Sequence, residues 1–141
     1  MELIVRATDA ALHNAIANHP EVKPTLGYND GPTDFTQLLD HPEAYILLSD
    51  GVGAAAIFEW SAPGVWQAHS MVLPDYRGRK AVSVAREMFD LMFNEGARMI
   101  WGMTPINNRA AQMFNRLIGA KPAGEGEDAT GRHVRFFIVE R

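Results

Sequence analysis

The stretch from residue 72 to residue 81, VLPDYRGRKA, has the composition of an anion-binding site. Arg77, Arg79 and Lys80 place three positive charges around Gly78, where an apolar run ends at a proline and a helical pattern begins. The first N–H groups of a helix have no partner within the helix, and the helix dipole adds partial positive charge at that end. These residues predict a site for a phosphate or pyrophosphate group, with a solvated basic helix start as the alternative.

Two side chains close to this stretch could accept a proton. His69 precedes it on the same predicted strand, and Glu59 lies on the predicted strand before that one. Either group could act as a general base, directly or through a water molecule. The structural alternatives are a histidine on a half-exposed strand and a surface carboxylate.

The sequence leaves little room for other chemistries. It has no cysteine, which excludes disulfides, thiolate metal ligands and a cysteine nucleophile. The three tryptophans, Trp60, Trp66 and Trp101, are predicted to pack within a sheet rather than to line an acceptor pocket. The remaining four histidines lack metal-ligand spacing and are predicted to be surface residues: His13, His19, His41 and His133.

Three strand-like runs precede the anion-binding stretch and must hold it in place. Turn sequences at residues 49–51 and 61–64 separate them at hairpin-like spacing. The pattern predicts an antiparallel meander of three strands: 44–48, 53–60 and 65–73.

A change of period follows the anion-binding stretch. Between residues 81 and 92 apolar side chains recur at three- and four-residue spacing, which predicts an amphipathic helix that ends at residues 94–96. The apolar run 98–103 comes next. A helix between two strands predicts a βαβ unit and therefore a parallel pair at the centre of the sheet.

The two ends of the chain carry weaker patterns. A short strand at 3–6 and a helix at 10–17, capped by Thr8 or Asp9, are predicted to precede a loop at 22–36 and a brief helix at 35–39. Beyond the βαβ unit we expect a polar connection at 124–131 and a last strand at 134–139. Between them the pattern predicts a helix at 109–117, with Gly119 as its C-cap and an apolar face made of Ala110, Met113, Phe114 and Leu117.

The composition predicts one α/β domain spanning residues 1–141. Of the 141 residues, 47% are hydrophobic and 21% are charged, which suits a single soluble core. The formal charge of −4 argues against nucleic acid as the partner. The N-terminus resembles no leader, and no apolar run approaches the ~18 residues of a membrane helix, so a cytoplasmic protein without a membrane partner is expected.

The anion-binding stretch resembles a motif of the GCN5-related N-acetyltransferase (GNAT) superfamily, V-x-P-x-Y-R-G-x-G-x-G. Lys80 and Val82 stand where that motif has its second and third glycines. The segment beginning at Asn107 resembles a second motif, N-x-x-A-x-x-L-Y…G-F, and the resemblance covers residues 44–120. The form of residues 77–85 is similar to acetyltransferase-like proteins of bacteriophages and bacteria. The residues that match the two motifs in register are Val72, Pro74, Tyr76, Arg77, Gly78, Asn107, Ala110 and Gly119.

The resemblance implies a mixed-sheet GNAT fold, acetyl-CoA as cosubstrate and a primary amine of a small molecule, peptide or protein as acceptor. The backbone of Ser70, Met71 and Val72 would bind the acetyl carbonyl and the pantetheine arm. Asn107 would contact the cofactor from the far side of the cleft, beside Phe114. The pyrophosphate would be held by Arg77 and wrapped by Gly78, Arg79, Lys80, Ala81, Val82 and Ser83.

The resemblance also raises an alternative function. Phe114 stands where many members have a tyrosine that protonates the leaving thiolate, and Gly102 stands where some have a carboxylate base. His69 and Glu59 remain as candidate bases, and a catalytically silent GNAT module is the alternative hypothesis.

A Rossmann-like nucleotide binder is disfavoured because its glycine-rich loop would follow the first strand. The resemblance implies that the loops at 22–36 and 124–131 determine which amine is accepted. An edge strand near the C-terminus would allow a homodimer.

Overall fold

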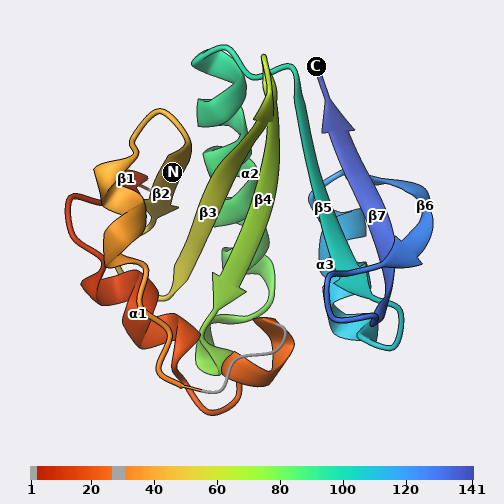
Figure 1. Ribbon diagram of the computed structural model, residues 1–141, viewed down its shortest axis with the longest axis horizontal. Helices are drawn as coiled ribbons and strands as arrows, with labels where there is room; N and C mark the ends of the chain where they lie inside the picture. Colours follow the sequence, from red (N-terminus) through yellow and green to blue (C-terminus); the bar gives the residue numbers. More distant parts are fainter. Residues whose placement is uncertain (1–2, 27–30) are drawn as a thin grey trace.

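The computed structural model describes residues 3–26 and 31–141, which form a seven-stranded sheet with helices on both faces (Figure 1). The strand order is β1-β2-β3-β4-β5-β7-β6. Short 3-10 helices at Lys23–Leu26, Thr36–Asp40 and Pro74–Tyr76 lie between the main elements. Along the chain these are β1 (Val5–Arg6), α1 (Ala11–Ala17), β2 (Tyr45–Ser49), β3 (Ala54–Ala62), β4 (Val65–Val72), α2 (Arg79–Asn94), β5 (Met99–Pro105), α3 (Arg109–Leu117), β6 (Lys121–Glu127) and β7 (His133–Glu140).

Strands β1 to β4 form an antiparallel meander, and β4 then pairs with β5 in parallel. Helix α2 makes the crossover between β4 and β5, so the predicted meander and βαβ unit are both confirmed. Strand β7 pairs antiparallel with β5 on one side and with β6 on the other. The parallel β4–β5 contact is therefore the only link between two antiparallel halves in the described sheet.

Helix α2 supplies one side of the main core. All six residues of its predicted apolar stripe are buried, because the 3.6-residue period keeps them on the face that meets the sheet. Phe58 of β3 meets Phe89 of α2 edge to face, with ring centroids 5.7 Å apart. A second cluster covers the opposite face of the sheet, where Ile16 and Ala17 of α1 pack against Ile57 and its neighbours. Residues 54–58 of β3 are buried and contribute to both clusters.

Strand β6 corrects the prediction of a polar connection at 124–131. Residues Lys121–Glu127 pair with β7 as an edge strand, although the sequence KPAGEGE lacks any alternation of apolar and polar residues. The pattern is absent because β6 is exposed almost throughout and buries no face. The connection between β6 and β7 is a tight turn around Asp128, whose carboxylate accepts hydrogen bonds from the N–H groups of Thr130 and Arg132.

The predicted apolar face of α3 is also corrected. No residue of α3 is buried, and Met113 and Leu117 are 53% and 50% exposed. The polar side of the helix faces the sheet instead, because the strands behind it offer polar partners. The Asn115 amide donates to the Thr104 hydroxyl at 2.8 Å, and Arg135 donates to Gln112 at 2.9 Å.

The prediction that His13 lies on the surface is wrong, because His13 is only 1% exposed. It precedes Ile16 and Ala17 by three and four residues, so it shares the buried face of α1. Its Nε2 lies 3.0 Å from the carbonyl oxygen of Leu48 and 3.2 Å from that of Ala56, an arrangement that requires the proton on Nε2. Burial lowers the pKa of His13 below the ordinary value of 6.5, and the two carbonyls offset only part of this effect.

Acidification is expected to destabilise the fold through His13. Because its pKa is lower in the folded protein, the unfolded chain binds the proton more tightly. The stabilising contribution is therefore complete above the unfolded pKa of 6.5 and falls as the pH drops toward the folded-state pKa. Chemical denaturation at several pH values should show a flatter acid limb for His13→Gln than for the wild type. An unchanged profile for the His13 variant would contradict this assignment.

Two further observations bear on what the chain can bind. Among residues 3–26 and 31–141, no helix combines the length and the apolar character needed to cross a bilayer. The same residues bring no three potential metal-binding side chains together.

Candidate active site

Strands β4 and β5 pair at one end and part at the other. Paired register runs only from Val65 to Gln67 on β4 and from Met99 to Trp101 on β5. Beyond these residues β4 stays on β3 as far as Val72, while β5 stays on β7. Figure 1 shows the two strands separating toward their C-terminal ends. Within residues 3–26 and 31–141 no strand pairs with these facing backbone edges, so their N–H and C=O groups are available to an extended ligand.

The predicted backbone contacts fall on this separated part of β4. Met71 is buried in the cluster on the α1 side, and Val72 packs on the cluster of the α2 side. Ser70 is exposed. The side chains of Met71 and Val72 pack on opposite faces of the sheet. Strand β4 therefore faces the opening with its backbone edge.

The chain turns from the end of β4 directly into α2. After the single turn Pro74–Tyr76, Arg77 is extended and Gly78 adopts φ 109° and ψ −148° as the N-cap of α2. This region is accessible only to glycine. The first bond within the helix runs from the Val82 N–H to the Gly78 carbonyl at 3.1 Å, and no side chain caps the helix. A Cβ at Gly78 would meet nothing within 4 Å, so the first turn is open to a ligand.

The structure brings most of the predicted pyrophosphate residues together at this turn. Arg77, Gly78, Arg79 and Lys80 are all exposed, and Ser83 is exposed one turn further along α2. Ala81 is buried, so it could offer only its backbone N–H, while Val82 is half-buried and its N–H already donates to the Gly78 carbonyl. Three cations thus surround the positive end of the helix dipole.

Sequence analysis missed one residue beside this turn, Asp50. Its carboxylate accepts a hydrogen bond from the Tyr76 hydroxyl and three from backbone N–H groups of its own turn. Burial acts to raise the pKa of Asp50, but these hydrogen bonds outweigh it and hold the pKa below its ordinary value. The Asp50-Gly51 pair had signalled a hairpin turn, but nothing in the pattern linked that turn to the anion-binding stretch.

His69 and Glu59 meet on the α1 face of the sheet. His69 Nε2 lies 3.2 Å from Glu59 Oε1, and the two side chains are 41% and 43% exposed. His69 follows Gln67, which stands opposite Trp101 in the parallel register, so the pair lies on the same face as that indole. The two predicted bases are therefore brought together, His69 from β4, which carries the open backbone edge, and Glu59 from the neighbouring strand β3.

The same face continues across the opening as an aromatic surface. The Trp101 indole N–H donates to the Ser61 hydroxyl at 2.9 Å, and its ring lies 6.3 Å from that of Phe136. Met103, two residues along β5, is 39% exposed. A compound approaching from this side would meet His69 on one half of the sheet and these apolar groups on the other.

Asn107 and Phe114 lie on the β5 side of the opening. Asn108, the neighbour of Asn107, caps α3 by accepting the Ala111 N–H at 3.1 Å. The cap therefore does not use the exposed Asn107 side chain. Phe114 is half-buried on α3 and carries no group that could donate to a leaving thiolate.

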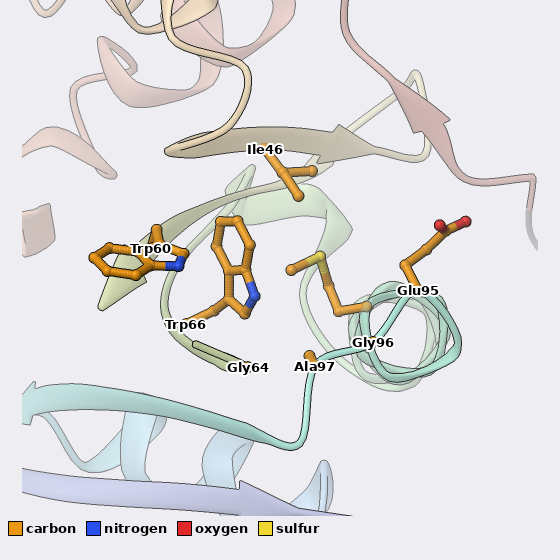
Figure 2. A pocket seen from close by; sticks show the side chains of 8 residues that line it. Ile46, Trp60, Gly64, Trp66, Glu95, Gly96 and Ala97 are labelled. Carbon is orange, nitrogen blue, oxygen red and sulfur yellow. The ribbon is translucent and has the colours of Figure 1, made fainter. Parts of the chain in front are cut away.

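A separate cavity lies at the far end of α2. Its volume is about 240 Å³, and Trp60 and Trp66 stand side by side in it (Figure 2). Gly96 and Ala97, which follow α2, close another side, so the cavity and Gly78 lie at opposite ends of that helix. The two tryptophans, expected to pack within the sheet, line this cavity together with Ile46, Gly64, Met92 and Glu95. It contains none of the predicted site residues.

No family model and no curated protein sequence matches this chain. The fold is nevertheless that of the GNAT acetyltransferases, as the two motifs implied. Aminoglycoside acetyltransferase AAC(6')-Ib in complex with coenzyme A matches with a TM-score of 0.80 at 14% identity, over 100% of this chain and 95% of that one. Ribosomal-protein-alanine N-acetyltransferase from Brucella melitensis matches with a TM-score of 0.74 at 18% identity, over 99% of each chain.

A third similar structure was solved with the cofactor itself. The Salmonella typhimurium protein yncA, bound to acetyl-CoA, matches with a TM-score of 0.74 at 18% identity, over 98% of this chain and 92% of that one. At these identities the similarity establishes the fold, and the activity has to be argued from the site.

Proposed function

We propose that this chain is an N-acetyltransferase that moves an acetyl group from acetyl-CoA to a primary amine of a small molecule, peptide or protein. The proposal rests on one observation: the backbone edge of β4 that faces the opening is followed, within a few residues, by the open first turn of α2. Acetyl-CoA has a matching order of parts, an extended amide-containing arm followed by a pyrophosphate. Residues 1–141 would act as one acetyltransferase domain.

The residues fit this ligand part by part. The arm would lie between β4 and β5 against the backbone of Ser70, Met71 and Val72. The pyrophosphate would bind the N–H groups that precede the first bond within α2, from Gly78 to Ala81, with the Ser83 hydroxyl one turn further on and Arg77 adding charge. Asn107 and Phe114 would border the arm from the β5 side.

The acceptor would approach over the α1 face, where His69 and Glu59 meet. When Nε2–H of His69 donates to Glu59, Nδ1 is left to accept a proton from the attacking ammonium group. A bond forms between the amine nitrogen and the acetyl carbon, the bond from that carbon to sulfur breaks, and the sulfur leaves as a thiolate. With Phe114 in place of a proton donor, positioning of the two reactants supplies most of the remaining rate enhancement.

Calorimetric titration tests the cofactor site. Wild-type protein is expected to bind acetyl-CoA saturably, and the Arg77→Ala, Lys80→Ala double variant to bind it at least about tenfold more weakly, because two charge-assisted contacts are lost. The matched control is Arg98→Ala with Lys121→Ala, which removes the same charge from exposed positions outside the turn. Equal affinity in the two double variants would mean that the turn does not hold the pyrophosphate.

A catalytically silent GNAT module is the second candidate, favoured by Phe114 and Gly102 at the positions named above. Release of free thiol from acetyl-CoA in the presence of a panel of amines separates the two functions. Saturable binding with no thiol release for any amine would support the silent module. The other expectations stay predictions: a cytoplasmic location, no nucleic-acid or membrane partner, and a homodimer formed through an edge strand near the C-terminus.

A further inference from the structure

The turn between β2 and β3 is built around one carboxylate. Asp50 Oδ1 accepts the N–H groups of Val52, Gly53 and Ala54 at 2.9, 3.0 and 3.2 Å. One oxygen of Asp50 is thus fully used in closing its own turn. Its second oxygen, Oδ2, points out of the turn and accepts the hydroxyl of Tyr76.

Tyr76 is held against this turn by packing as well. A Cβ at Gly53 would lie 2.6 Å from Cδ1 and 2.8 Å from Cγ of the Tyr76 ring, so the ring occupies the space that a side chain would need. The Leu73 N–H also donates to the Gly53 carbonyl at 2.9 Å. The β2–β3 turn therefore supports the end of β4 and the segment that leads into α2.

The Tyr76 ring also contacts a cation. Lys80 Nζ lies 5.0 Å from the ring centroid, within the range of a cation–π contact. Burial and the hydrogen bond to Asp50 raise the pKa of Tyr76 above 10.0, so its hydroxyl remains a donor at neutral pH. Asp50, Tyr76 and Lys80 thus form a chain of contacts that runs from the β2–β3 turn to the first turn of α2.

We infer that Asp50 and Tyr76 are positioning residues that hold the Lys80 ammonium group at the first turn of α2, where it binds a phosphate group of the cofactor. The inference rests on the proposed function and concerns how the anion site is built. Lys80 stands where the GNAT motif has a glycine, so the backbone approach of that motif is replaced here by a side-chain cation. A long lysine side chain loses rotamer freedom when it binds, and the Tyr76 ring removes part of that freedom beforehand.

The experiment compares two ligands in four proteins: wild type, Tyr76→Phe, Lys80→Met and the double variant. Tyr76→Phe keeps the ring over Gly53 and removes only the hydroxyl that Asp50 holds. It is expected to weaken acetyl-CoA binding about tenfold, because a ring no longer tied to Asp50 fixes the Lys80 side chain less well before binding, and to raise KM with little change in kcat. Binding of acetyl-pantetheine, which has no phosphate, should not change. In the Lys80→Met background the same substitution should have no further effect.

Tyr45→Phe is the matched control, because it removes a hydroxyl from a half-buried tyrosine of β2. Equal losses for acetyl-CoA and acetyl-pantetheine, or additive losses in the double variant, would make Tyr76 a merely structural residue and overturn the inference alone. A wild-type protein that binds acetyl-pantetheine and acetyl-CoA equally would also overturn it. If the wild type binds neither ligand, the proposed function fails as well.

Discussion

His69→Gln is expected to lower kcat for acetyl transfer by about a hundredfold, the lower end of the range for loss of a general base. Glutamine keeps an amide that can donate to Glu59 but cannot take a proton from the attacking amine. Because His69 lies on the α1 face and the anion site lies at the start of α2, the dissociation constant for acetyl-CoA should not change. The two measurements together separate a chemical role from a binding role.

Two further variants sharpen this prediction. Glu59→Gln should lower kcat less than His69→Gln, since it removes the negative charge of the partner at 3.2 Å but leaves an acceptor oxygen and the imidazole in place. His133→Gln, at an exposed position on β7, is the control and should behave as wild type. A His69→Gln enzyme with wild-type kcat would exclude this residue as the base and leave transfer to positioning alone.

Gly78→Ala has the second largest expected effect, on cofactor binding. At φ 109° and ψ −148° an alanine is strained, and relaxation of the turn would redirect the N–H groups that are proposed to bind the pyrophosphate. We expect at least about a tenfold loss of acetyl-CoA affinity, because hydrogen bonds to a charged group are among the stronger ones.

Helix α2 offers a matched control at its other end. Gly96 also has a positive φ, of 116°, and a Cβ there would likewise meet nothing within 4 Å. Gly78→Ala and Gly96→Ala should therefore destabilise the fold similarly, by about 1–3 kcal/mol each. Only Gly78→Ala should weaken acetyl-CoA binding. A similar loss of affinity in both variants would trace the effect to general destabilisation and count against the proposed site.

The elements with a strong hydrophobic period could be predicted without coordinates. The stripe from Ala81 to Met92 is buried as its spacing indicated, because a helix on a sheet must turn one face inward. The meander and the parallel pair followed from short turns and from a helix placed between two apolar runs. Motif order then led to the correct fold. The predicted cap of α1 is wrong, because its N-cap is Ala10 and no side chain caps the helix, although Asp9 accepts the Ala11 N–H.

Elements whose stability depends on a neighbour could not be predicted in this way. Strand β6 exists because β7 offers it a pairing edge, and no pattern in KPAGEGE records that edge. The apolar side of α3 stays exposed because Thr104 and Arg135 bind its polar side. The burial of His13 could have been predicted, because its spacing to Ile16 and Ala17 places all three residues on one face of α1.

The order of residues along the chain was enough to define the basic turn at Gly78, the amphipathic helix after it and the strands on either side, because all of these are local patterns. Only the folded chain decided that β4 and β5 part, that His69 meets Glu59, and that Asp50 holds Tyr76 beside Lys80. These features join residues that are distant in sequence. Their geometry is set by packing across the sheet, which no local pattern encodes.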